Sequence, residues 1–124
     1  MKKFVWVGLS IVLIACGKPL PDLAPIDLNQ WKEDKGGCNQ KRMTFLTDVQ
    51  NQLDELKGLS EKDIIKLLGR PDQTELYKRN QKFYNYDITP GKNCNGTDGV
   101  GQQLIVRFTA MGYAKEVSIE STNR

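Results

Sequence analysis

The chain has 124 residues, with 18 Lys and Arg against 15 Asp and Glu and no His, which gives a net charge of +3. Lys2 and Lys3 lie in the first fifteen residues, which are expected to be removed from the mature chain. Without these two lysines, 16 basic and 15 acidic residues give a net charge of +1. A nearly neutral chain offers no basic surface for nucleic acid. Because it also lacks His and any Cys-x-x-Cys pair, it holds no ready set of metal ligands. We therefore expect no nucleic acid, no metal and no cofactor.

Residues 1–15 are predicted to be a lipoprotein signal peptide. Two lysines precede an almost unbroken apolar run, Phe4 to Ala15, which is too short to cross a bilayer as a helix. The run ends in "LIAC", which resembles a bacterial lipobox, so we expect Cys16 to be lipidated and to begin the mature chain. An ordinary signal peptide is the alternative. In lipoproteins of this kind Gly17 favours the outer membrane, and we expect a lipid anchor on its periplasmic face.

Residues 16–30 are predicted to form an extended tether. Three prolines, Pro19, Pro21 and Pro25, disfavour a helix in this stretch. Trp31 is predicted to mark the point where the chain joins its folded domain. Residues 31–124 are enough for one modest hydrophobic core but not for two, so we expect one domain.

Two helices are predicted after the tether. The first runs from Met43 to Lys57, because its apolar residues recur on one face at helical spacing; they are Leu46, Val49, Leu53 and Leu56. The second lies in "GLSEKDIIKLLGRPD", between an N-cap at Ser60 with Asp63 as its capping-box partner and a left-handed C′ residue at Gly69. The short connection makes them an αα-hairpin.

Beyond Pro71 the apolar residues alternate with polar ones, which is typical of an antiparallel sheet covered on one side. Strands are predicted in "QKFYNYDI", "QQLIVRFT" and "AKEVSIES", with Gly112 in the last turn, and "TELYKR" adds a short edge strand that turns at Asn80. The residues expected to face inward are Tyr84, Tyr86, Ile88, Leu104, Val106, Phe108, Val117 and Ile119. We therefore predict a two-layer α+β domain, an αα-hairpin packed on one face of a three- or four-stranded antiparallel sheet.

Lipidation of Cys16 leaves Cys38 and Cys94 as an even pair in an oxidising compartment, which predicts a disulfide. Closing a loop of this length is worth roughly 4 kcal/mol in the chain-entropy model, before strain. A reactive or metal-binding thiol is the alternative. Cys94 lies in the glycine-rich segment "TPGKNCNGTDGVG", which has neither the Gly-Lys-Ser/Thr of a phosphate-binding loop nor a helix after it. A structural staple is therefore favoured.

The stretches "GLSEKDIIKLLGRPD", "FYNYDI" and "LIVRFTAMGYAKEVSIE" resemble the SmpA/OmlA (BamE) family of small outer-membrane lipoproteins. This resemblance implies two helices followed by an antiparallel meander. It also implies an accessory role in the machinery that inserts β-barrel proteins into the outer membrane. The Cys38 and Cys94 pair and the long glycine loop depart from that family's pattern. The same fold outline resembles β-lactamase inhibitor proteins, which keeps a periplasmic inhibitor as the alternative.

An enzyme is not expected, since the chain offers no His as a general base and no paired-carboxylate arrangement. The outward row of the predicted sheet instead carries apolar and charged residues that can contact a partner; the candidate binding residues are Phe83, Ile105, Arg107 and Tyr113. An edge strand that pairs with a partner's strand is a second route. The sequence thus predicts a non-catalytic adaptor for envelope proteins.

Overall fold

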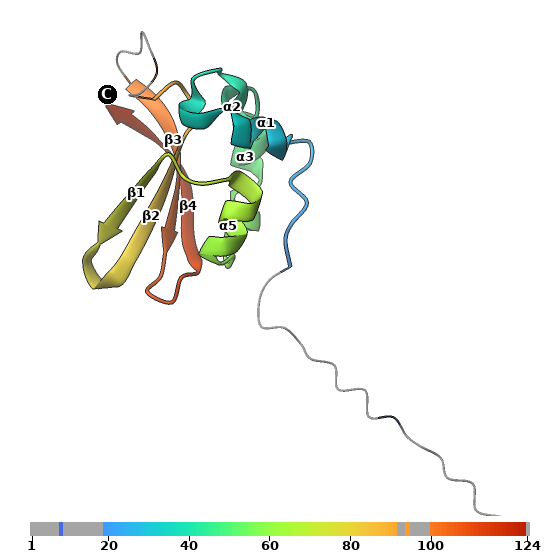
Figure 1. Cartoon of the computed structure of the whole chain (residues 1–124), viewed down its shortest axis with the longest axis vertical. Helices are drawn as coiled ribbons and strands as arrows, with labels where there is room; N and C mark the ends of the chain where they lie inside the picture. Colours follow the sequence, from blue (N-terminus) through green and yellow to red (C-terminus); the bar gives the residue numbers. More distant parts are fainter. Residues whose placement is uncertain (1–7, 9–18, 92–93, 95–99, 124) are drawn as a thin grey trace, which may run out of the picture.

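The computed structural model describes residue 8, residues 19–91, residue 94 and residues 100–123. The predicted lipidation site at Cys16 and most of the glycine loop lie outside these residues. Helices cover one face of a four-stranded antiparallel sheet with strand order β1-β2-β3-β4 (Figure 1). The predicted two-layer α+β fold is therefore confirmed, with the edge strand as a fourth member of the sheet. In the described part of the chain, no helix is long and apolar enough to cross a membrane.

The sheet consists of β1 (Gln73–Tyr77), β2 (Gln81–Asp87), β3 (Val100–Phe108) and β4 (Ala114–Asn123). A short 3-10 turn, η2 (Lys78–Asn80), joins β1 to β2. The register places Tyr84 beside Val106 and Val106 beside Val117, so the inward residues form one continuous row. Between β3 and β4 the N–H of Gly112 donates to the Thr109 carbonyl at 2.9 Å, with φ at 85°, a backbone conformation that favours glycine.

The hydrophobic core lies between this inward row and the helices. Tyr86, Ile88, Leu104, Val106 and Phe108 are fully buried, as are Ile64 and Leu59 from the helical layer. The rings of Tyr84 and Phe108 meet edge to face, with centroids 4.6 Å apart. The predicted division of the strands into an inward and an outward face is therefore correct.

The short helix α5 (Glu61–Leu68) is bounded as its sequence predicts. The Ser60 hydroxyl accepts a hydrogen bond from the Asp63 N–H at 3.2 Å, and Gly69 ends the helix with φ at 79°. Its ψ of −174° is extended, so Gly69 does not have the left-handed conformation predicted for a C′ residue. The positive φ, which favours glycine, is as predicted. Just before α5, the Gly58 N–H and the Leu59 carbonyl both bond to the backbone of Ala114, which ties the helical layer to β4.

The predicted continuous helix from Met43 to Lys57 is wrong in one respect, since the stretch forms three short helices: α2 (Lys41–Thr44), α3 (Leu46–Asn51) and α4 (Leu53–Leu56). The breaks fall at Phe45 and Gln52, whose N–H groups bond to carbonyls three residues back. The side chain of Gln52 donates to the Leu23 carbonyl at 3.2 Å, a tertiary contact at the second break. The apolar face nevertheless points inward, because Val49 and Leu56 are buried.

The predicted extended tether is too long at its C-terminal end. Leu23 and Ile26 are buried in the core, and α1 (Leu28–Glu33) begins where the tether was expected to continue. The carboxylate of Asp27 caps α1 by accepting from the N–H groups of Asn29 and Gln30. All three prolines precede this cap, so none of them interrupts the helix. Trp31, in α1, is fully buried, but it does not mark the start of the domain as predicted, because the chain already joins the core at Leu23.

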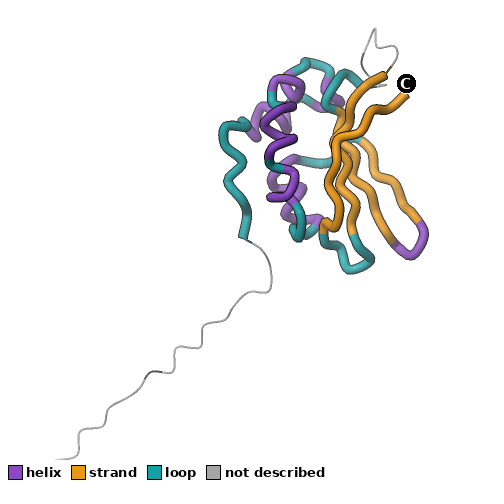
Figure 2. The backbone as a smooth tube through the Cα atoms, turned by 180° about the vertical axis from the view of Figure 1, so that it is seen from behind, coloured by secondary structure: helices purple, strands orange, loops and turns teal. Residues whose placement is uncertain are grey.

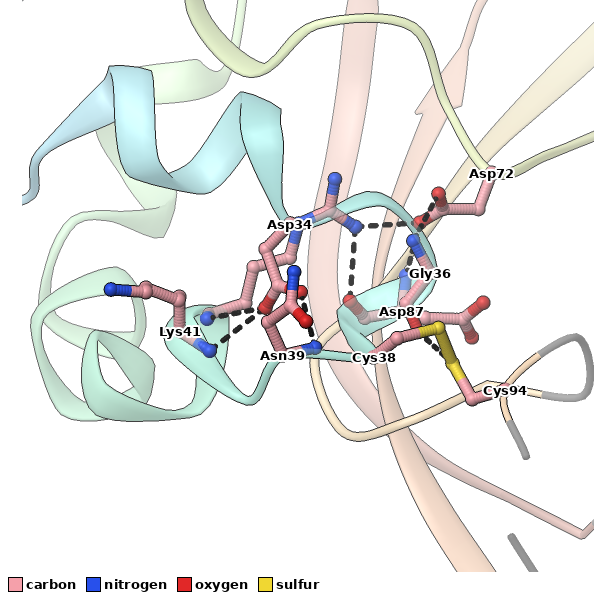
Figure 3. Close-up of a disulfide and its surroundings, with 9 residues drawn as sticks. Asp34, Gly36, Cys38, Asn39, Lys41, Asp72, Asp87 and Cys94 are labelled. Atoms are coloured by element: carbon pink, nitrogen blue, oxygen red, sulfur yellow. Dashed lines mark hydrogen bonds and ion pairs between the residues drawn. A yellow bond between two sulfur atoms is a disulfide. The ribbon is translucent and has the colours of Figure 1, made fainter. Parts of the chain in front are cut away.

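Cys38 follows the 3-10 turn η1 (Lys35–Gly37) and forms a disulfide with Cys94, with 5.4 Å between the two Cα atoms (Figure 3). The N–H of Gly91 donates to the Gly36 carbonyl at 2.8 Å beside it. The disulfide therefore joins the segment before α2 to the segment that follows β2.

Replacing both cysteines, in Cys38→Ser/Cys94→Ser, is expected to lower the free energy of unfolding by about 2–4 kcal/mol, because the unfolded chain loses a long-range constraint. Urea unfolding of the double variant and of oxidised wild type measures the difference. Adding reductant should bring wild type to the same midpoint. Equal stability of the oxidised and reduced proteins, or free thiols in non-reducing peptide maps, would contradict a structural disulfide.

Candidate functional site

The face of the sheet opposite the helices carries a groove. The helices of the described residues lie on one side of the sheet, and none of them covers the other side (Figure 2). The register sets Phe83 beside Arg107, Asn85 beside Ile105, and Ile105 beside Ser118 on this outer face. The groove has a volume of about 170 Å³ and is lined by Glu75, Phe83, Asn85, Ile105, Arg107, Glu116, Ser118 and Glu120. Its walls come from all four strands.

Asn85 lies at the centre of the groove, on β2, and is only 4% exposed. Its side-chain oxygen has no hydrogen-bond partner among the described residues. A buried acceptor left in this state costs about 1–3 kcal/mol, so it is normally satisfied by water or by a ligand. Asn85 alternates with the inward residues Tyr84 and Tyr86 and so belongs to the outward row, but it is not among the predicted binding residues. The feature of the sequence that could have selected Asn85 is its polar amide side chain in the middle of an internal strand.

The groove is acidic. Of the described residues that line it, Glu75, Glu116 and Glu120 are acidic and Arg107 alone is basic, and Arg107 forms an ion pair with Glu116. The Nε atom of Arg107 is buried and has no partner in the described part of the chain. One unused donor therefore accompanies the unused acceptor of Asn85, and the charged rim keeps a net negative balance.

Three of the four predicted binding residues are brought together in this groove, and the fourth is not. Phe83, Ile105 and Arg107 line it. Tyr113 lies instead at the turn before β4, where it forms a bridge with Ser60, and its side chain is 44% exposed. A β-bulge between Arg107 and Phe108 shifts the register just before this turn. Tyr77, which was not predicted, extends the apolar wall because its ring meets Phe83 edge to face at 5.9 Å.

A buried polar cluster on the other side of the sheet joins the helices to β2. Arg42, 1% exposed, donates from Nη1 to Asp72 Oδ2 at 2.6 Å and to the Asp87 carbonyl at 3.0 Å. Its Nε donates to the Trp31 carbonyl at 2.9 Å. Asp72 also accepts from the backbone N–H groups of Gly36 and Asp87 (Figure 3). The charges of Arg42 and Asp72 are thus paired with each other and hydrogen-bonded to backbone groups, which indicates a structural role.

Asp34 completes this region as a buried cap. Its carboxylate accepts from the backbone N–H groups of Asn39, Lys41 and Arg42 at 2.7, 2.8 and 3.0 Å. Gly37 lies so close to the end of β2 that an added Cβ would stand 2.9 Å from the Asp87 carbonyl oxygen. These contacts hold the loop before α2 against the sheet. Across residues 19–91, 94 and 100–123, no three His, Cys, Asp or Glu side chains gather as a metal-binding group.

Two buried tyrosines connect the sheet to α5. The Tyr84 hydroxyl donates to Glu61 Oε1 at 2.9 Å, and the Tyr86 hydroxyl donates to the Gly69 carbonyl at 2.8 Å. Burial raises the pKa of Tyr84 from 10.0 to about 12, and the adjacent Glu61 carboxylate raises it further by hydrogen bonding and by charge repulsion. Burial also raises the pKa of Tyr86. Both side chains are therefore neutral in the folded protein at any physiological pH.

These shifts predict a loss of stability at high pH. Because the folded pKa of Tyr84 lies above its unfolded value, its contribution is fully present below pH 10 and is lost as the pH rises through about 12. Urea unfolding from pH 8 to 12 should show that the free energy of unfolding of wild type falls with pH. In Tyr84→Phe this fall should be smaller by up to about 2–3 kcal/mol. Tyr77→Phe, at a site 60% exposed, is the control and should follow wild type. Identical slopes for wild type and Tyr84→Phe would contradict this.

No protein-family model, curated protein or solved structure matches this chain. The resemblance to the SmpA/OmlA family therefore stays a prediction based on the quoted motifs.

Proposed function

We propose that this protein is a lipid-anchored, non-catalytic adaptor that binds another envelope protein through the groove on the outer face of its sheet. The location we propose is the periplasmic face of the outer membrane, and the partner is a subunit of the β-barrel assembly machinery. The anchor, the location and the partner rest on the lipobox and on the resemblance of the helix and strand motifs. The binding role rests on the groove, and above all on the buried oxygen of Asn85, which has no partner among the residues that the structure describes.

The composition of the groove suits protein recognition. Phe83 and Ile105 are half-buried and supply apolar contact area, while Asn85 and Arg107 supply an acceptor and a donor that nothing else in the described chain uses. A small apolar centre with a charged rim is typical of protein–protein interfaces. Burying even a few such side chains at the centre of an interface can carry most of its binding energy.

The proposal predicts that single charges in the groove weaken binding without unfolding the domain. Phe83→Asp and Ile105→Asp should each reduce partner recovery at least about tenfold, because each removes apolar contact area from the groove and adds a carboxylate that must be desolvated on binding. Crosslinking of isolated membranes followed by affinity purification and mass spectrometry measures recovery. A thermal melt of each variant checks its folding, and both should melt within a few degrees of wild type.

Tyr113→Asp is the matched control, since it adds the same charge at an exposed site outside the groove. It should recover the partner as wild type does. Cys16→Ser tests the anchor in the same experiment and should leave the protein unprocessed or in the soluble fraction. Normal recovery by folded Phe83→Asp and Ile105→Asp would show that the groove is not the binding surface.

A further inference from the structure

The charge and hydrogen-bonding groups of the groove indicate what kind of side chain it accepts. Three carboxylates, from Glu75, Glu116 and Glu120, stand around it. Arg107 is the cation that lines it, and this guanidinium is already paired with Glu116. Glu75 and Glu120 therefore leave the groove with an excess of negative charge, which favours a positively charged guest and disfavours an anionic one.

We propose that the groove receives one cationic side chain, Lys or Arg, from an extended segment of the partner protein. This inference rests on the proposed function, because it names the chemistry of that same site. The ammonium or guanidinium donates to the Asn85 oxygen at the centre and lies between the carboxylates of Glu75 and Glu120. The aliphatic stem packs on Phe83 and Ile105, as the stems of long cationic side chains do on apolar surface.

The geometry of the unused polar atoms supports a cation over a neutral side chain. The Asn85 oxygen is an acceptor, so its ligand must donate a hydrogen bond, and all hydrogen-bonding atoms of Lys and Arg are donors. Phe83 adds an aromatic ring whose face attracts a cation. A neutral donor such as a hydroxyl would satisfy Asn85 but would leave the carboxylate excess uncompensated.

The unused Nε donor of Arg107 supports a polypeptide over a free metal ion or a polyamine. A donor in the lining of the groove needs an acceptor, and a backbone carbonyl next to the inserted side chain supplies one. A simple cation has no such acceptor. The Asn85 oxygen therefore matches the cationic side chain of an inserted residue, and the Arg107 Nε donor matches that residue's peptide carbonyl.

Blocked pentapeptides test the inference directly. Four peptides of sequence Ala-Ala-X-Ala-Ala, with X as Lys, Arg, Gln or Glu, are titrated into the mature protein while the backbone NMR signals of β2 and β3 are followed. The Lys and Arg peptides should bind at least about tenfold more tightly than the Gln peptide, with shifts centred on Asn85 and Ile105. The Glu peptide should not bind. Raising the salt concentration should weaken the binding of the Lys and Arg peptides, because salt screens the attraction between exposed charges.

Variants separate the parts of the site. Asn85→Leu, which removes the acceptor, and Glu75→Gln/Glu120→Gln, which removes the excess charge, should each abolish the preference for Lys and Arg over Gln. Glu33→Gln, in α1, is the control and should change nothing. Equal affinity for the Gln and Lys peptides, or no binding of any peptide, would overturn the inference. If the groove variants Phe83→Asp and Ile105→Asp still reduce partner recovery in that case, the proposed function stands without the cationic guest.

Discussion

The Val106→Asp variant is expected to be unfolded at 25 °C. Val106 is fully buried at the centre of β3, between Tyr84 of β2 and Val117 of β4. A carboxylate there is removed from water without a partner, which costs more than most single substitutions and exceeds the margin by which a small domain is stable. Circular dichroism and urea unfolding measure the loss.

The neighbouring residue provides the control for this prediction. Ile105 lies on the same strand but on the outer face, where it lines the groove. Ile105→Asp introduces the same charge one position away and should remain folded, with a change of about 1 kcal/mol or less. A folded Val106→Asp, or an Ile105→Asp that unfolds as completely, would contradict the assignment of the two faces.

Arg42→Met is expected to lower the free energy of unfolding by about 3–5 kcal/mol. The side chain of Met fills part of the space, but the Asp72 carboxylate then stays buried beside β2 without its 2.6 Å ion-pair partner. The carbonyls of Trp31 and Asp87 also lose the donors that Arg42 supplies. Urea unfolding at pH 7 measures the effect, and the buried position of the pair makes it insensitive to salt.

Lys82→Met is the matched control for Arg42→Met. Lys82 pairs with Glu61 at 3.0 Å, but its side chain is 43% exposed, so the pair is screened by water. Its loss should cost about 1 kcal/mol or less. If Arg42→Met and Lys82→Met lower the free energy of unfolding by the same amount, the buried cluster around Arg42 does not stabilise the junction between the helices and the sheet. An unchanged Arg42→Met protein would lead to the same conclusion.

Features that depend on residues close together in the chain could be predicted from the sequence. The alternation of apolar and polar residues defined the strands and their two faces, because side chains point to opposite sides at every step along a strand. The cap at Ser60 and the glycine at Gly69 defined α5, since each acts on the backbone within a few residues. The same alternation placed Phe83, Ile105 and Arg107 on one surface, so most of the candidate site followed from it.

Features that depend on contacts between distant segments could not be predicted in this way and became visible in the folded protein. The break at Gln52 lies where its side chain bonds to Leu23, and residues 23–30 pack on the domain because its core offers them an apolar surface. The pairing of Arg42 with Asp72 joins residues thirty positions apart. Asn85 became part of the site because it lines a groove built from all four strands and its oxygen has no partner in the described part of the chain. Hydrogen bonding between segments that are distant in the sequence is a property of the assembled molecule, and the local alternation of residues does not encode it.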